Sequence, residues 1–172
     1  MKYSTKKLTI LSFFTTLALG LYWVESLLPT LVPIAGIKLG LANIITLIIL
    51  KNFSMREAFP VLFMRILIAT FLFGQFISLF YSLAGGVFCL LAMTLILKLL
   101  QGHFLFLTSI FGALFHNLGQ LLVALLLTKS LAVLTYLPFF ILSAVITGLF
   151  TGLCAHFAQK YLAKFLHAQS FQ

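Results

Sequence analysis

Acidic residues are almost absent from this chain of 172 residues. Glu25 and Glu57 are its two acids, and charged residues of both signs make up 8% of the chain, against about 25% in a soluble domain. The chain therefore lacks paired aspartates that could hold Mg²⁺ and a diphosphate. It also lacks the GxxxxGK[ST] loop that cradles the phosphates of ATP. We expect a protein that is not itself an enzyme and that needs no cofactor, metal or catalytic residue.

Cysteines are equally scarce. Cys89 and Cys154 both lie inside apolar runs, where we expect small packing residues and neither a disulfide nor a metal pair. Basic residues are more numerous and give a net charge of +9. They stand singly between apolar runs without forming a basic stripe, which argues against nucleic acid as a partner.

Apolar residues dominate what is present, at 63% of the chain. They fall in long runs, and a helix needs about 20 apolar residues to cross the hydrocarbon of a bilayer. We predict an all-α integral membrane protein of the plasma membrane, with six helices in one domain, a basic N-terminus (1–7) and a C-terminal tail (156–172). The spans are expected at residues 8–24, 37–50, 57–76, 78–97, 104–128 and 131–155.

The basic residues also predict an orientation, because cytoplasmic loops carry an excess of Lys and Arg. With six crossings, Lys38 and Lys129 fall on one side and Arg65 lies within the third span. Both termini are therefore expected in the cytoplasm, with Lys38 outside. The cytoplasmic side would then carry the other eight cations, namely Lys2, Lys6, Lys7, Lys51, Arg56, Lys98, Lys160 and Lys164.

Polar side chains inside the spans are few, and each must face protein or a water-filled cavity because exposing it to hydrocarbon is costly. The fifth span, FGALFHNLGQLL, is the richest. At 100° per residue, His116, Asn117, Gln120 and Gly112 share an arc about 140° wide. This arc favours the wall of a ligand cavity, and hydrogen bonding between helices is the alternative.

Arg65, in FPVLFMRILIAT, is a second candidate. It lies about eight residues, or roughly 12 Å, inside the third span. Glu25 is the carboxylate that could form a structural ion pair with it. A ligand carboxylate or phosphate would satisfy the guanidinium equally well, through two parallel hydrogen bonds.

The stretch PIAGIKLGLAN is a third candidate. We expect the second helix to begin near Lys38, so that its free backbone N–H groups and the lysine together favour an anion. Gly36 and Gly40 would then lie one turn apart and let a ligand or another helix approach, with Asn43 one turn further along. The alternative is a lysine that snorkels to the interface, beside glycines that serve helix packing.

Small residues form stripes that permit close contact between helices. Ser12, Thr16 and Gly20 recur every four residues in the first span. The pair Gly85 and Gly86 marks either a kink or a close approach in the fourth span. The last span carries a similar stripe at Ala144, Gly148 and Gly152.

Several of these features together resemble a known family. They are Glu25, PIAGIKLGLAN, Arg65, YSLAGG at 81–86 and GALFHNLGQL at 112–121. The family is called heptaprenyl diphosphate synthase component I, or the Gx transporter family, and the resemblance covers spans one to five best. By this resemblance the chain is related to the substrate-binding S components of energy-coupling factor (ECF) transporters. Those six-helix proteins capture a ligand from outside and dock on a coupling membrane subunit with two ATPases.

The resemblance implies a subunit of an uptake transporter that captures a small anionic amphipathic molecule, such as a vitamin, a quinone precursor or a prenyl phosphate. It also implies docking through Ser12, Thr16 and Gly20, although the alanine pair typical of S components is missing here. One alternative is a non-catalytic membrane subunit or anchor for polyprenyl diphosphate or quinone biosynthesis. Another is a structural protein whose polar residues only join helices. The expected ligand contacts are Glu25, Lys38, Asn43, Arg65, His116, Asn117 and Gln120.

Overall fold

The computed structural model describes residues 5–27, 40–73 and 76–169, with side chains as far as residue 162. Within these ranges the chain is entirely helical apart from short connections. Its elements are α1 (Thr5–Ser26), α2 (Asn43–Asn52), α3 (Met55–Phe73), α4 (Phe76–Leu99), α5 (Leu105–Thr128), the 3-10 helix η1 (Leu131–Tyr136) and α6 (Leu137–Gln169).

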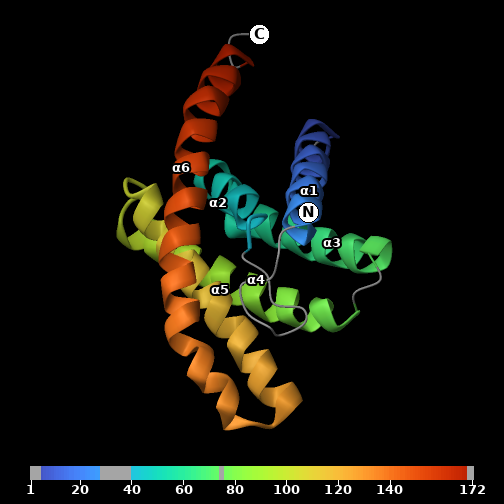
Figure 1. The fold of residues 1–172 in the computed structure, drawn as a ribbon. Coiled ribbons are helices and arrows are strands. Elements are labelled where there is room, and N and C mark those ends of the chain that lie inside the picture. Colours follow the sequence, from blue (N-terminus) through green and yellow to red (C-terminus); the bar gives the residue numbers. More distant parts are fainter. Residues whose placement is uncertain (1–4, 28–39, 74–75, 170–172) are drawn as a thin grey trace.

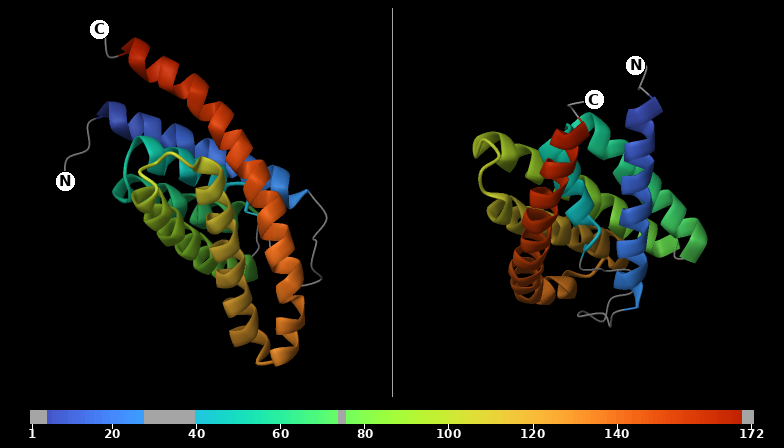
Figure 2. Two further views of the ribbon diagram at one scale, coloured as in Figure 1. Left: turned by 90° about the vertical axis from the view of Figure 1, so that its left-hand side faces the viewer. Right: turned by 90° about the horizontal axis from the view of Figure 1, so that it is seen from above.

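Helices α4, α5 and α6 pack side by side, and α5 and α6 form an antiparallel hairpin that η1 closes (Figure 1). Helix α3 packs between α1 and α4, and α2 contacts α3, α4 and α6. The start of α1 and the end of α6 lie at the same end of the molecule (Figure 2). The short helix α2 is thus placed inside the bundle, where its first residues meet α3 and α5.

Four helical segments of the described residues are long and apolar enough to cross a membrane, by length and composition alone. They are α1, α4, α5 and residues 131–162, and they identify a multi-pass membrane protein. Helix α2 has 10 residues and is about 15 Å long, which is half the thickness of the hydrocarbon core. Six crossings with both termini in the cytoplasm therefore stay a prediction.

The start of the second helix differs from the expectation. Helix α2 begins at Asn43 and not near Lys38, because Gly40 adopts a φ of +84° and the next two residues form a turn. This left-handed conformation is open to glycine and interrupts a right-handed helix. Gly40 therefore does not share a helical face with Asn43. Gly36 and Lys38 lie outside the described residues.

The last helix also differs. The chain leaves α5 through Lys129, which has a left-handed φ of 50°, and Ser130 then caps η1 by accepting a hydrogen bond from the N–H of Ala132. Helix α6 follows with Pro138 in its first turn, where a proline costs no intrahelical hydrogen bond. It continues through the expected tail as far as Gln169.

The small-residue stripe of α6 packs inside the chain against α5. A Cβ added at Gly148 would lie 2.5 Å from the Cα of Ile110, and one at Gly152 would lie 3.0 Å from the Cα of Phe106. Ser109 and Thr151 share a hydrogen bond of 2.6 Å across the same interface. This stripe therefore serves contact between helices and is not available to another subunit.

One ion pair is present among the described residues. Lys7 Nζ lies 2.6 Å from Glu57 Oε1, and Ser54 also donates a hydrogen bond to the same carboxylate. Glu57 is 8% exposed. The pair ties the start of α1 to the start of α3.

We expect Glu57→Gln to lower the free energy of unfolding by roughly 0.2–1 kcal/mol, because the pair is partly solvated at Lys7. Denaturation of Glu57→Gln, Lys7→Gln and the double variant in detergent measures this coupling. A coupling energy of zero across this cycle would contradict the prediction.

Candidate functional site

Glu25, near the end of α1, holds the turn that leads into α2. Its carboxylate accepts hydrogen bonds from the N–H of Gly40 and, at 3.0 Å, from the N–H of Leu41. The side chain is 6% exposed. We expected the backbone N–H groups of this stretch to attract an external anion. Two of them are instead bonded to a carboxylate of the chain itself.

Arg65 on α3 reaches the first residue of α2. Its Nη2 donates to Asn43 Oδ1 at 3.1 Å, and both side chains are buried. Burial disfavours the guanidinium charge, and the carboxylate of Glu25 partly offsets this effect. The Nε atom has no hydrogen-bond partner among the described residues. Arg65 therefore combines a structural contact with a buried donor that is still free.

His116 on α5 lies between two glycines of other segments. A Cβ added at Gly40 would lie 3.1 Å from His116 Cδ2, and one at Gly85 would lie 2.9 Å from His116 Nδ1. The glycines therefore allow the imidazole itself to approach the backbone of α4 and of the turn before α2. The ring is 3% exposed. Its nitrogens have no well-aligned hydrogen-bond partner among the described residues, although the backbone of Gly85 lies against the imidazole.

Gln120 follows one helical turn after His116 and is completely buried. Both polar atoms of its amide lack a partner among the residues that the structure describes. Residues four apart lie on the same helix face, so Gln120 extends the face of His116. Such a buried and unsatisfied pair is uncommon, because buried polar groups are nearly always hydrogen-bonded.

Asn117 does not join this face. It turns to α6, where its Nδ2 donates to the Phe140 carbonyl at 2.8 Å and to Ser143 Oγ at 3.2 Å. These contacts match the alternative interpretation of the arc, in which polar side chains form hydrogen bonds between helices. The predicted arc therefore faces two sides, because α5 has neighbours on both. Asn117 bonds to α6, whereas His116 and Gln120 face the buried cluster.

Gly86, Gly112 and Gly119 meet apolar or backbone atoms. A Cβ at Gly86 would lie 2.9 Å from Leu62 Cδ1, and one at Gly112 would lie 2.3 Å from Met93 Cε. Helix α4 is continuous through the glycine pair, and the pair allows close approach. Sequence reasoning missed Gly119, whose added Cβ would lie 2.8 Å from the carbonyl oxygen of Ala84. Its place in FHNLGQ, seven residues and thus about two helical turns after Gly112, was the available signal.

The stripe on α1 has a different environment. Ser12, Thr16 and Gly20 are exposed, and no heavy atom would come within 4 Å of a Cβ at Gly20. Large apolar side chains beside them are exposed as well, including Phe13 at 60%. Nothing within the described residues covers this face.

Gln120 and Asn117 form a matched pair for a test of stability. We expect Gln120→Leu to raise the free energy of unfolding of ligand-free protein by about 1–3 kcal/mol, since it removes an unsatisfied buried amide. Asn117→Leu should lower it by about 0.6–2 kcal/mol, since it removes hydrogen bonds between helices. Unfolding in detergent measures both, and a loss of stability in Gln120→Leu would mean that the amide is satisfied within the protein.

Comparison with known proteins adds one result. No curated protein and no solved structure matches the chain. The family described as heptaprenyl diphosphate synthase component I matches residues 14–158, a range that includes Glu25, Asn43, Arg65, His116 and Gln120. The match covers most of the chain and confirms the predicted resemblance. The chain therefore belongs to the heptaprenyl diphosphate synthase component I family.

Proposed function

We propose that the protein captures a small anionic amphipathic molecule for uptake across the plasma membrane, and that partner ATPases supply the energy. The observation that carries the proposal is a buried cluster of polar atoms that lack well-aligned hydrogen-bond partners among the described residues. They belong to Arg65, His116 and Gln120. Each unsatisfied buried group costs about 1–3 kcal/mol, and a ligand that bonds these groups would recover that energy.

The chemistry of the three side chains supports an anion with polar substituents. Arg65 offers a positive charge and a free N–H, which suit a carboxylate or phosphate oxygen. The imidazole of His116 and the amide of Gln120 can each donate and accept hydrogen bonds, and would fix the orientation of the ligand. With the predicted topology, ligand would enter from outside, past the stretch that contains Lys38.

Mass spectrometry of small molecules tests the proposal. The protein is purified from its own membrane in mild detergent, washed and denatured, and the released molecules are quantified per mole of chain. We expect one anionic molecule to be released in near-stoichiometric amount. Release of detergent and bulk lipid alone, in the proportions found in the membrane, would contradict ligand capture.

Docking on an ATPase module is the second part of the proposal, and the exposed stripe of Ser12, Thr16 and Gly20 supports α1 as the docking face. Gly20→Trp should lower the co-purification of ATPase subunits at least about tenfold without changing the unfolding temperature, because an interface cannot close over a bulky ring. Leu91→Trp is the control, since Leu91 is 51% exposed on α4. Equal losses in the two variants, or none in either, would contradict docking through this face.

The family description favours a second candidate, a non-catalytic membrane subunit of a prenyl diphosphate synthase. Glu25 bonds to backbone N–H groups and Glu57 to Lys7 and Ser54, which leaves neither acid suited to pair around a metal diphosphate. The catalytic residues would have to come from a soluble partner. An affinity pull-down separates the candidates, since recovery of a prenyltransferase favours the accessory subunit and recovery of ATPases favours transport.

A further inference from the structure

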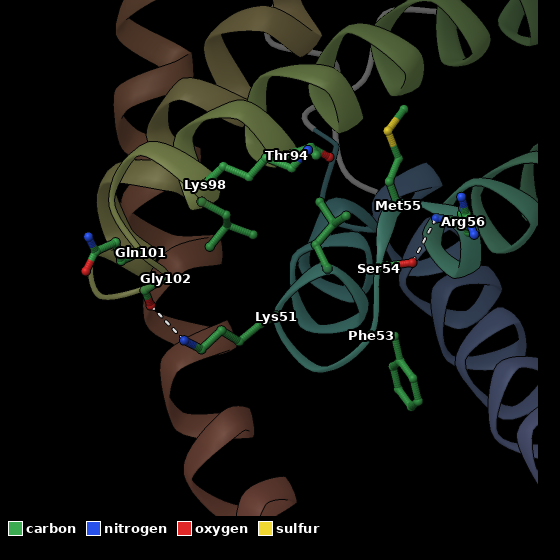
Figure 3. A pocket seen from close by; sticks show the side chains of 11 residues that line it. Lys51, Phe53, Ser54, Met55, Arg56, Thr94, Lys98, Gln101 and Gly102 are labelled. Carbon is green, nitrogen blue, oxygen red and sulfur yellow. Dashed lines mark hydrogen bonds between the residues drawn. The ribbon is translucent and has the colours of Figure 1, made fainter.

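A cavity of about 520 Å³ lies at one end of the bundle, away from the cluster around Arg65 and His116. It is bounded by the turn between α2 and α3 and by the end of α4 with the loop to α5 (Figure 3). Three cations line it, namely Lys51, Arg56 and Lys98. No acidic side chain is among the described residues that line it.

The three cations come from three different helices. Lys51 belongs to the last turn of α2, Arg56 to the first turn of α3 and Lys98 to the last turn of α4. Figure 3 shows Lys51 and Lys98 on one side of the cavity and Arg56 on the other. The fold therefore brings Lys98 to the same cavity as Lys51 and Arg56, which lie more than 40 residues earlier in the sequence.

No acidic side chain of the described residues pairs with Arg56 or Lys98. Glu57, which is adjacent to Arg56 in sequence, is bonded to Lys7 and Ser54 and does not line the cavity. The concentration of positive charge at this cavity is thus available to an anion.

The loop after α4 fixes one of the lysines. Gln101 and Gly102 have φ angles of 49° and 75°, and this turn presents the Gly102 carbonyl to Lys51 Nζ at 2.8 Å. A Cβ at Gly102 would lie 2.6 Å from that Nζ atom. Lys51 is therefore held at the cavity, while Phe53 and Met55 supply an apolar part of its lining.

We propose that this cavity binds a phosphate-bearing anion at the membrane surface. Arg56 can bond two phosphate oxygens at once, and Lys51 and Lys98 add positive charge around the group. Helix α4 is long and apolar enough to span a membrane, so its end lies near the headgroups, where basic pockets between helices bind anionic lipids. The phosphate belongs either to a phospholipid headgroup or to a free diphosphate. This site is separate from the capture of ligand at Arg65 and His116 and does not depend on it.

The test compares phosphatidylglycerol with phosphatidylcholine, which carries the same phosphate but no net charge. Each is titrated into the full chain in detergent, and bound lipid is counted by native mass spectrometry. Arg56→Gln/Lys98→Gln should weaken binding of phosphatidylglycerol about 25-fold, at about fivefold per charge. Lys6→Gln/Lys160→Gln removes two exposed charges elsewhere and should change binding less than about twofold. Lys98→Arg should retain the wild-type affinity.

A second arm uses inorganic pyrophosphate and reads the unfolding temperature. A rise that disappears in Arg56→Gln/Lys98→Gln supports a free diphosphate as the source, and selective binding of phosphatidylglycerol supports a lipid headgroup. Equal binding of the two lipids together with no response to pyrophosphate would overturn the proposal. So would equal losses in the cavity variant and in Lys6→Gln/Lys160→Gln, which would indicate a general effect of charge.

Discussion

Arg65→Ala is expected to lower the amount of small anion retained by the purified protein about 10- to 150-fold. A hydrogen bond to a charged group contributes about 1.5–3 kcal/mol, which corresponds to this range in affinity. Arg65 is the cation with a free donor inside the buried cluster, and alanine removes both the charge and the donor. The measurement is the quantity of released anion per mole of chain, in wild type and variant prepared in parallel.

Two further variants separate loss of binding from loss of folding. Arg65→Lys keeps the charge but loses the planar fork of donors, and we expect an intermediate retention. Lys6→Ala removes an exposed cation and should retain as much anion as wild type. Full retention in Arg65→Ala, with an unchanged unfolding temperature, would show that the anion does not bind at this cluster.

Gly148→Ala is expected to destabilise the protein by about 3 kcal/mol, at the upper end of overpacking effects. The added Cβ would lie 2.5 Å from the Cα of Ile110. Because the obstacle is backbone, rotation of a side chain cannot relieve it, and α5 and α6 would have to separate. Denaturation in detergent, followed by loss of helical signal, measures the effect.

Gly20→Ala is the matched control on α1. A Cβ at Gly20 meets no heavy atom within 4 Å, and alanine is a better helix former than glycine by about 1 kcal/mol. We therefore expect a small gain in stability. If both variants lost the same stability, the close contact between α5 and α6 would be wrong.

Helix positions were predicted best where an apolar run ends in polar residues. The spans expected at 78–97 and 104–128 correspond to α4 and α5 within two residues at each end. Two other expected boundaries differ from the observed helix ends for physical reasons. Helix α2 starts late because Gly40 takes a left-handed conformation, which hydropathy does not report. Helix α6 runs past 155 because a drop in hydropathy ends a membrane span but does not end a helix.

The polar cluster could be predicted in part. Helical periodicity placed His116 and Gln120 on one face, and the structure keeps them there. Periodicity could not show that Asn117 bonds to α6 and not to the cluster, because it does not report which helices lie on either side of α5. The role of Glu25 could not be predicted either. Its contact with Gly40, 15 residues later, depends on the left-handed conformation of Gly40 and on the turn that follows.

A cryo-electron microscopy map of the protein purified from its native membrane tests the central claim most directly. If His116 and Gln120 belong to a ligand site, the map should contain density that is not protein within hydrogen-bond distance of these side chains and of Arg65 Nε. If those side chains instead bond to one another or to neighbouring helices, with no density between them, the cluster is structural and the proposed capture function is wrong.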